Sequence, residues 1–309
     1  MSASPGNADK GLMGVLLAAG KGSRIQPFSA STPKPLLPVL DRPLLVWQIE
    51  TMRRLGIEDV VILVGHLGHE IVRTLGDGSR YGVRLRYVEQ EQALGIAHAV
   101  GKLEPHVDRP FLLFLGDIFF ETENLVEMLR LFEREDVDGV LAVKEEPDLA
   151  AIQRNFTVEE DERGFVRRVI EKPRSPRTNR KGCGLYLFDT TIFDAVRRTP
   201  RTALRDEYEF TDSIQIFIEY GYGVVAAPVI QRDLNLYALD RSKEENYIGA
   251  EVRIHGEATI ERCVLMDRVR IETPITLRDC VVFSDVTLAG REDLSSVIVT
   301  EESQIRCDD

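Results

Sequence analysis

Up to about residue 240 the chain alternates short apolar runs with segments of helical pattern, and this alternation constrains the fold more than any other feature. The expected strand and helix pairs are 15–19 with 44–55, 60–64 with 69–75, 83–88 with 96–103, and 111–115 with 124–132. The pattern predicts an α/β protein with a Rossmann-like mixed, mainly parallel sheet flanked by helices. Ligands of such folds bind at the carboxyl ends of the strands.

Two later regions depart from the alternation. Between Val137 and Phe188 helices become rare, and the apolar runs 139–143, 165–170 and 184–188 predict an antiparallel extension of the sheet. In the last sixty or so residues, apolar pairs recur every five or six residues, which is typical of a parallel β-helix. These pairs are 252/254, 258/260, 264/266, 269/271, 275/277, 281/283 and 286/288.

A glycine-rich turn follows the first apolar run. Gly20 and Gly22 let the backbone approach a ligand with no Cβ in the way, and Arg24 and Lys34 add fixed positive charge. Residues 11 to 40 contain no acidic side chain, although the whole chain has a formal net charge of -12. This contrast predicts a polyanionic ligand such as a triphosphate. A tight connecting loop without a ligand is the alternative.

Several other classes of protein are disfavoured by the sequence. The turn lacks the Gly-x-x-x-x-Gly-Lys-Ser/Thr pattern and the third glycine of the dinucleotide fingerprint. The acidic balance argues against nucleic acid or an anionic membrane as partner. No apolar run approaches the roughly 18 residues that a membrane span needs, and the polar residues 1–10 lack a signal-peptide core. A cytoplasmic protein is therefore expected.

The cysteines and paired histidines carry no clear metal pattern. Cys183, Cys263, Cys280 and Cys307 show no Cys-x-x-Cys spacing, so packing roles in a reducing compartment are expected. The segment from His66 to His69 has no third nitrogen or sulfur ligand nearby, and we assign it no function.

Seven segments, taken together and in order, resemble the signature of the sugar-1-phosphate nucleotidyltransferases. They are residues 17–24, 34–38, 90–99, 115–117, 171–173, 184–188 and 207–212. The resemblance extends over about residues 13–247 and is strongest to the long-form glucose-1-phosphate thymidylyltransferases. It implies a flexible N-terminus (1–12), a catalytic domain (13–247) and a short left-handed parallel β-helix domain (248–309).

The resemblance also implies a role for individual residues. The catalytic residues would be Arg24 over the β- and γ-phosphates, Lys34 between the two reacting phosphates, Asp117 on the metal and Lys172 on the sugar phosphate. The nucleotide would be bound by Leu17, Ala18, Ala19, Gly20, Gly22, Ser23, Gln90 and Gly95. The sugar phosphate would be bound by Asp117, Glu171, Lys172 and Gly184.

Two further roles concern the metal and the base. Asp117 and Asp233 align with the family's Mg²⁺ ligands, although Asp233 has the alternative of capping an expected helix at 236–245. Gln90 precedes Gly95 by the spacing that the family uses to bind a pyrimidine. A side-chain amide offers both a donor and an acceptor to the edge of thymine or uracil. This favours dTTP or UTP over GTP, with family preference towards dTTP.

The sequence departs from the family pattern in three respects. Ile118 replaces the asparagine that usually follows the metal aspartate, and Leu234 and Asn235 replace a Gly-Thr pair. Where the family usually has a glycine against the sugar, Phe156 or Thr157 is expected to enter the sugar pocket. These departures affect the choice of sugar more than the reaction.

The sequence thus predicts a Mg²⁺-dependent enzyme that joins a hexose 1-phosphate, with glucose 1-phosphate favoured, to dTTP and releases pyrophosphate. A dianionic phosphate needs no general base, so the protein must supply alignment and charge compensation. The alternatives are a UTP-dependent uridylyltransferase and a non-catalytic regulatory relative. The β-helix is expected to have an interaction or oligomerisation role rather than acyl transfer, because it is short and contains His255 as its single histidine. The chain is expected to form a homo-oligomer.

Overall fold

The computed structural model divides the chain into two compact units, residues 1–20 with 48–233 and residues 21–47 with 234–309. We refer to them as the first and the second unit. The structure describes residues 11–20, 33–36, 38–39, 42–122, 124–202, 206–235, 246–249, 251–265, 268–278, 280–283, 285–295, 297–299 and 304–306.

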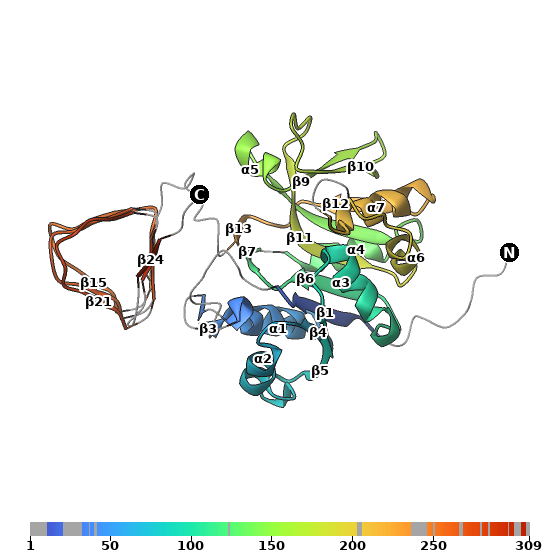
Figure 1. Ribbon diagram of the computed structural model, residues 1–309. Coiled ribbons are helices and arrows are strands. Elements are labelled where there is room, and N and C mark those ends of the chain that lie inside the picture. The colour runs from blue at the N-terminus through green and yellow to red at the C-terminus, as the bar shows by residue number, and fades with distance from the viewer. Residues whose placement is uncertain are drawn as a thin grey trace. The chain divides into compact units, whose positions relative to one another are not determined.

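The first unit is built on one mixed sheet (Figure 1). Its parallel half consists of β6 (Phe111–Leu115), β1 (Met13–Ala18), β4 (Asp59–Val64) and β5 (Arg84–Glu89), in that order. Its other half begins with β11 (Arg180–Phe188), which runs antiparallel to β6, and continues with β8 (Gly139–Glu145) and β12 (Val224–Ala227). The hairpin of β9 (Phe156–Glu160) and β10 (Val166–Glu171) joins β11 through Lys181.

The predicted α/β class and the antiparallel extension are therefore confirmed. The expectation of a mainly parallel sheet is wrong for the other half, where β11 runs antiparallel to β6, β8 and β9, and β9 runs antiparallel to β10, although β12 pairs in parallel with β8. The reason lies in the connections, because parallel neighbours need a helical crossover, whereas short links such as 161–165 between β9 and β10 join antiparallel strands.

The helices pack on the sheet through apolar stripes. They are α1 (Leu44–Arg54), α2 (Gly68–Leu75), α3 (Ile96–Leu103), α4 (Val126–Phe132), α5 (Leu149–Gln153), α6 (Ile192–Val196) and α7 (Phe210–Glu219), with single 3-10 turns at Lys34–Leu36, Ser79–Tyr81 and Glu104–His106. Helices α3, α6 and α7 cover the face of the sheet that carries Val15 and Leu113. Gly14 lies on the opposite face, where Met52 of α1 packs against it.

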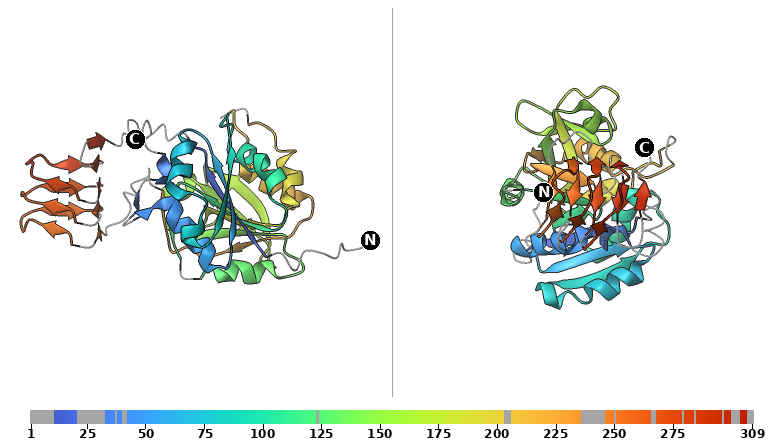
Figure 2. Two further views of the ribbon diagram at one scale, coloured as in Figure 1. Left: turned by 90° about the horizontal axis from the view of Figure 1, so that it is seen from below. Right: turned by 90° about the vertical axis from the view of Figure 1, so that its left-hand side faces the viewer.

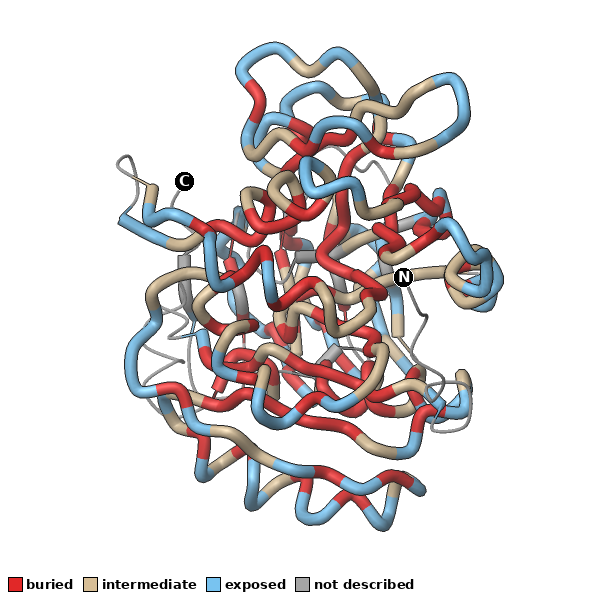
Figure 3. The backbone as a smooth tube through the Cα atoms, turned by 90° about the vertical axis from the view of Figure 1, so that its right-hand side faces the viewer, coloured by how far each residue is buried: buried red, intermediate tan, exposed pale blue. Residues whose placement is uncertain are grey.

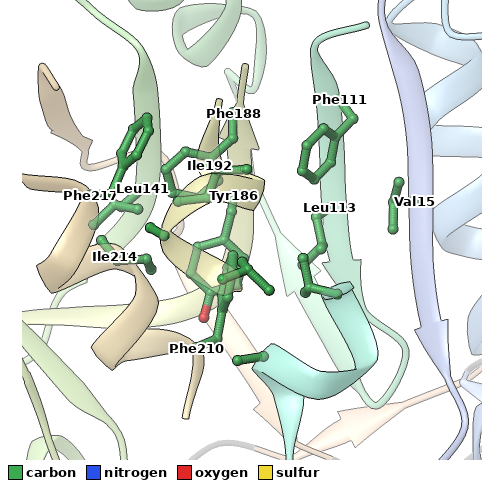
Figure 4. Packing of buried hydrophobic residues seen from close by; sticks show 14 of the residues in the cluster. Val15, Phe111, Leu113, Leu141, Tyr186, Phe188, Ile192, Phe210, Ile214 and Phe217 are labelled. Carbon is green, nitrogen blue, oxygen red and sulfur yellow. The ribbon is translucent and has the colours of Figure 1, made fainter. Parts of the chain in front are cut away.

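Aromatic rings fill the core between α6, α7 and the sheet (Figure 4). Phe188 contacts Phe210 and Phe217 edge to face, with ring centroids 5.9 and 5.8 Å apart. Tyr186 meets Phe210 in the same way at 5.2 Å. Burial follows the strands, and the exposed residues lie mainly on loops and outer helix faces (Figure 3). This packing gives the carboxyl ends of the strands a rigid base.

The C-terminal part of the second unit contains three short parallel sheets (Figure 2). Partner strands are seventeen residues apart along the chain, as are the paired side chains Arg268 and Asp285. The first sheet holds β14 (Tyr247–Ile248), β17 (Val264–Leu265), β20 (Val281–Val282), β23 (Val297–Val299) and the antiparallel β24 (Gln304–Arg306). The others hold β15 (Arg253–Ile254), β18 (Arg270–Ile271) and β21 (Thr287–Leu288), and β16 (Thr259–Glu261), β19 (Thr276–Arg278) and β22 (Leu294–Ser295). The remaining strands of this unit, β2 (Pro38–Val39) and β3 (Arg42–Pro43), pair with each other.

The interior of these sheets corrects part of the sequence pattern. The pairs 269/271, 275/277 and 286/288 are buried as expected, but at two turns the buried pairs are Cys263/Leu265 and Cys280/Val282. Cysteine acts here as a small apolar residue, so the buried pair begins one position earlier than the predicted pairs 264/266 and 281/283. Cys183 is also buried, and all three thiols are unbridged, which confirms their packing role. Cys307 lies outside the described residues.

Within the described segments, every helix is too short or too polar to cross a membrane.

Candidate active site

The predicted nucleotide-binding segment lies at the carboxyl end of β1, between the ends of its two neighbours. The Gly116 amide donates to the Leu17 carbonyl over 2.9 Å, which joins β1 to the turn after β6. On the side of β4, the backbone N–H of Gln90 donates to the Val64 carbonyl over 2.7 Å. Asp117 directly follows this junction. The structure thus brings Gln90 and Asp117 to one edge of the sheet with Leu17, Ala18, Ala19 and Gly20.

Four predicted residues cannot be placed at this edge. Gly22, Ser23 and Arg24 lie outside the described residues. Lys34 is buried in the 3-10 turn Lys34–Leu36, which belongs to the second unit. Their roles stay predictions.

A buried glutamine holds the turn that carries Asp117. Gln48 of α1 donates its Nε2 hydrogens to the carbonyls of Leu115 and Ile118, over 2.9 and 3.0 Å. These two acceptors flank Asp117 in sequence, so one side chain fixes both ends of the turn. Ile118 itself is buried, and its side chain is directed into the protein. The aspartate is therefore presented from a rigid base.

Gly184 lets β11 approach the same turn. Its φ of +70° lies in the left-handed region, and a Cβ there would stand 2.7 Å from Leu115 Cδ1 and 2.9 Å from Ile118 Cδ1. Farther along β11, burial raises the pKa of Tyr186, and the nearby negative charges of Glu171 and Asp117 raise it further. Two of the predicted sugar-side carboxylates thus lie around one buried ring.

Glu171 ends β10, and Lys172 follows it in a strained conformation. Lys172 has a φ of +44°, which is costly for a residue with a Cβ, and its amide donates to the Asn155 carbonyl over 2.7 Å. Its Nζ lies 4.0 Å from Glu171 Oε1, and 41% of its side chain is exposed. Thr211 Oγ1 lies 3.5 Å from the other carboxylate oxygen. Glu171 is thus held from two sides, while the ammonium reaches solvent.

Gln90 and Gly95 lie beside two residues to which the sequence analysis gave no role. Gln90 Nε2 lies 2.8 Å from His98 Nδ1, and the His98 ring stacks on Tyr208 with centroids 6.4 Å apart. Burial, assisted by the charge of Lys102, lowers the pKa of His98. Gly95 has a φ of +107°, and a Cβ there would stand 2.5 Å from the Tyr208 carbonyl oxygen. Only glycine fits this position without displacing the backbone.

Asp233, the second predicted metal ligand, lies in β13 (Arg232–Asn235), which pairs with β7 (Ile118–Glu121) next to Asp117. It does not precede a described helix, because residues 236–245 lie outside the described segments. Both of its carboxylate oxygens accept hydrogen bonds from Lys181 Nζ, over 2.9 and 2.8 Å. Both oxygens of this carboxylate are thus engaged by an ammonium in the structure. Among the described residues no group of three or more His, Cys, Asp or Glu side chains has the arrangement of a metal site.

The side chains expected to enter the sugar pocket are buried within the sheet instead. The Phe156 ring fills the space beside Gly182, where a Cβ would stand 1.8 Å from the ring, and it stacks on Tyr186. Thr157 Oγ1 donates to the Arg180 carbonyl over 2.9 Å. Phe156 is accommodated because Gly182 faces it across the sheet.

Sequence reasoning missed Gln48, His98, Tyr208 and Lys181. The sequence offered a signal for three of them. His98 and Tyr208 belong to segments that carry the family resemblance, and Lys181 belongs to a stretch without acidic residues after Glu171. Gln48 gave no signal, because a buried polar residue in an amphipathic helix is visible only once its acceptors are known.

Known proteins resemble this chain over most of its length. The family model described as nucleotidyl transferase matches residues 13–233. The nucleotidyltransferase Agl11 of low-salt glycan biosynthesis, from Haloferax volcanii, is 37% identical over 215 residues, which are 69% of this chain and 59% of that protein. AglF of the same organism, a UTP–glucose-1-phosphate uridylyltransferase, is 32% identical over 80% of this chain and 98% of its own length. A glucose-1-phosphate thymidylyltransferase of Streptomyces griseus is 36% identical over 68% of this chain and 58% of its own length.

Solved structures show the same fold. A structure titled as a putative glucose-1-phosphate thymidylyltransferase from Bacillus anthracis superposes with a TM-score of 0.62 at 27% identity, and covers 70% of this chain and 86% of that one. This chain spans about three fifths of the length of Agl11 and of the Streptomyces relative. The match over residues 13–233 and the identities to these relatives establish the family. The chain belongs to the nucleotidyl transferase family, and its relatives place it with the sugar-1-phosphate nucleotidyltransferases.

Proposed function

We propose that this chain transfers a nucleotidyl group from a nucleoside triphosphate to a hexose 1-phosphate. An oxygen of the sugar phosphate forms a bond to the α-phosphorus while the bond to the β-phosphate oxygen breaks, and pyrophosphate leaves. The observation that carries the proposal is the junction of β1 and β6, where the Gly116 amide binds the Leu17 carbonyl beside Asp117. Leu17, to which we assign a role in nucleotide binding, and Asp117, to which we assign a role towards the sugar phosphate, lie on either side of this contact.

The protein's part in this reaction is alignment and charge compensation, because the attacking phosphate is already a dianion. We propose that Lys172 binds the sugar phosphate with its exposed ammonium and that Glu171 accepts hydrogen bonds from sugar hydroxyls. Arg24 and Lys34 would neutralise the triphosphate, as the family resemblance implies.

Asp117 is the described carboxylate that we propose as a Mg²⁺ ligand, since its turn is fixed by Gln48 and oxygen ligands suit this ion. When bound, Mg²⁺ supplies positive charge to the phosphates. We do not extend this role to Asp233.

For the base, we propose a pyrimidine held by the Gln90 amide and the backbone at Gly95. The pairing of Gln90 with His98 supports this, because it fixes the orientation of an otherwise rotatable amide. dTTP with glucose 1-phosphate is the favoured pair, in keeping with the Streptomyces griseus relative. UTP is the alternative, which the name of AglF supports.

For the C-terminal part, we propose that the three parallel sheets form a left-handed β-helix that mediates self-association. The seventeen-residue spacing of partner strands and the continuous apolar interior support a coiled arrangement. Light scattering of the full chain against a chain ending at residue 247 tests the association.

The reaction is tested by measuring pyrophosphate release from dTTP, UTP, GTP, CTP and ATP with several hexose 1-phosphates. We expect turnover with a pyrimidine triphosphate and a hexose 1-phosphate. Asp117→Asn is the matched inactive control. Absence of pyrophosphate release from every pair would refute the catalytic proposal and favour the non-catalytic relative.

A further inference from the structure

A charge cluster of Lys144, Glu146, Lys181 and Asp233 lies where β8, β11 and β13 meet. Lys181 Nζ bonds both oxygens of Asp233 and lies 3.4 Å from Glu146 Oε2. Lys144 Nζ binds the same Glu146 oxygen at 2.7 Å and lies 3.8 Å from Asp233 Oδ1. Two positive and two negative side chains therefore alternate in space.

The cluster is nearly closed to solvent. Lys181 and Glu146 each expose 5% of their side chains, and Asp233 exposes 11%. Lys144 and Lys181 are cross-strand partners on β8 and β11, a pairing of like charges that is unfavourable unless carboxylates stand between them. The Lys181 ammonium is surrounded by both Asp233 oxygens and by Glu146 Oε2, which suits a cation.

This arrangement leaves Asp233 poorly suited to a metal. A divalent cation that approached its oxygens would meet the Lys181 ammonium less than 3 Å from both of them, in surroundings that screen repulsion weakly. Metal binding would require Lys181 to leave Asp233 and to lose its nearly buried carboxylate partners.

We propose that Lys181 is the permanent counter-ion of Asp233 and takes the place of a metal there, so that Asp233 does not ligate Mg²⁺ in this chain. Lys181 is then a positioning residue, which ties β13 to β8 and β11 beside the turn of Asp117. This assignment rests on the proposed function, since it concerns the charges around the proposed reaction site. Its test measures metal binding and does not require turnover.

The test is a titration of the full chain with Mn²⁺ alone, followed by electron paramagnetic resonance of the unbound ion. Lys181→Ala uncovers both Asp233 oxygens and should bind Mn²⁺ more tightly than the native chain by about tenfold or more. Lys144→Ala is the matched control, since it removes a lysine from the same cluster but leaves Lys181 on Asp233. Its affinity should equal that of the native chain.

A second variant covers the case in which Lys181→Ala does not fold. The neutral pair Lys181→Gln with Asp233→Asn leaves no uncompensated charge, and its Mn²⁺ affinity should match that of the native chain. A loss of about tenfold or more in this pair would show that Asp233 is a ligand and would overturn the proposal. So would a folded Lys181→Ala chain with unchanged affinity. Neither result depends on pyrophosphate release, so failure of the proposed reaction is seen separately.

Discussion

Gln90 Nε2 lies 2.8 Å from His98 Nδ1, and an amide nitrogen can only donate. Nδ1 must then accept, which places the proton of the neutral ring on Nε2. The lowered pKa of His98, caused mainly by burial and also by Lys102, favours this neutral form. The contact thus connects the orientation of the proposed base-binding amide to the protonation of one histidine.

The first prediction concerns pH. A protonated His98 would present a hydrogen to an amide that also donates, so the KM for dTTP should rise once the pH falls below the lowered pKa of folded His98, which lies under the ordinary histidine value of about 6.5. The folded pKa is below the unfolded one, so the unfolded chain binds the proton first, and stability should also fall as the pH decreases through this window. Initial rates between pH 5.5 and 8 measure the first effect.

His98→Gln should remove the pH dependence of the nucleotide KM, and His98→Ala should raise that KM by about fivefold at neutral pH, the effect of one net hydrogen bond. The KM for the sugar phosphate should change little. His69 is an exposed histidine on α2, and His69→Gln is the control. It should leave the KM values for the nucleotide and the sugar phosphate unaltered. An unchanged pH profile in His98→Gln would contradict the role given to the Gln90 contact.

The second prediction concerns Asp117. Asp117→Asn removes a negative charge at the β1 and β6 junction while keeping the shape of the side chain. We expect kcat to fall by about a hundredfold or more, a loss typical of a group that acts on transition-state charge. The melting temperature should stay within a few degrees of the native value. Retained turnover in a folded variant would remove Asp117 from the reaction.

The third prediction concerns Gln48. Gln48→Leu leaves the buried carbonyls of Leu115 and Ile118 without this donor, and the free energy of unfolding should fall by about 2 kcal/mol. Urea denaturation measures the loss. Gln153→Leu is the control, because Gln153 also donates to a backbone carbonyl, that of Arg174, but in an exposed position. Equal losses in the two variants would show that burial of the Asp117 turn does not matter.

The edge of the sheet that carries the site could be predicted from the sequence because it follows local rules. The apolar run before Gly20 ends β1, the run before Gly116 ends β6, and parallel neighbours bring such ends together. Gln90 follows β5 for the same reason. To predict each of these positions, one needs only the length of the strand and the residue at which it ends.

The charge cluster could not be predicted, because it depends on contacts between distant strands. Lys181 and Asp233 are separated by 52 positions, and no local pattern marks Lys181 as buried. Its burial follows from the pairing of β11 with β8, which the sequence does not encode locally. The burial of Cys263 in place of Val264 was missed for another reason, because a cysteine can belong to either a polar or an apolar pattern.

The fourth prediction compares two glycines with positive φ. Gly95→Ala places a Cβ 2.5 Å from the Tyr208 carbonyl oxygen, whereas Gly76, with a φ of +65°, has open space at the same position. Gly76→Ala should cost about 1–3 kcal/mol of unfolding free energy, the penalty of the backbone conformation alone, because its ψ of -144° at this φ is rarely adopted by a residue with a Cβ. Gly95→Ala should cost more than this and should also raise the KM for the nucleotide. Equal costs would mean that Tyr208 can move away without penalty.

The last prediction concerns the stability of the charge cluster. Lys181→Ala leaves Asp233 and Glu146 with one nearby ammonium, that of Lys144, and the free energy of unfolding should fall by about 3–5 kcal/mol, as for other broken buried pairs. The neutral pair Lys181→Gln with Asp233→Asn should lose much less, because hydrogen bonding remains and no charge is stranded. Arg268→Ala is the exposed control. Arg268 binds both carboxylate oxygens of Asp285, which is half exposed and remains solvated when Arg268 is removed. The free energy of unfolding should therefore fall least in this variant. Denaturant unfolding of the four chains measures these values, and a Lys181→Ala loss no greater than that of Arg268→Ala would show that the cluster is effectively solvated.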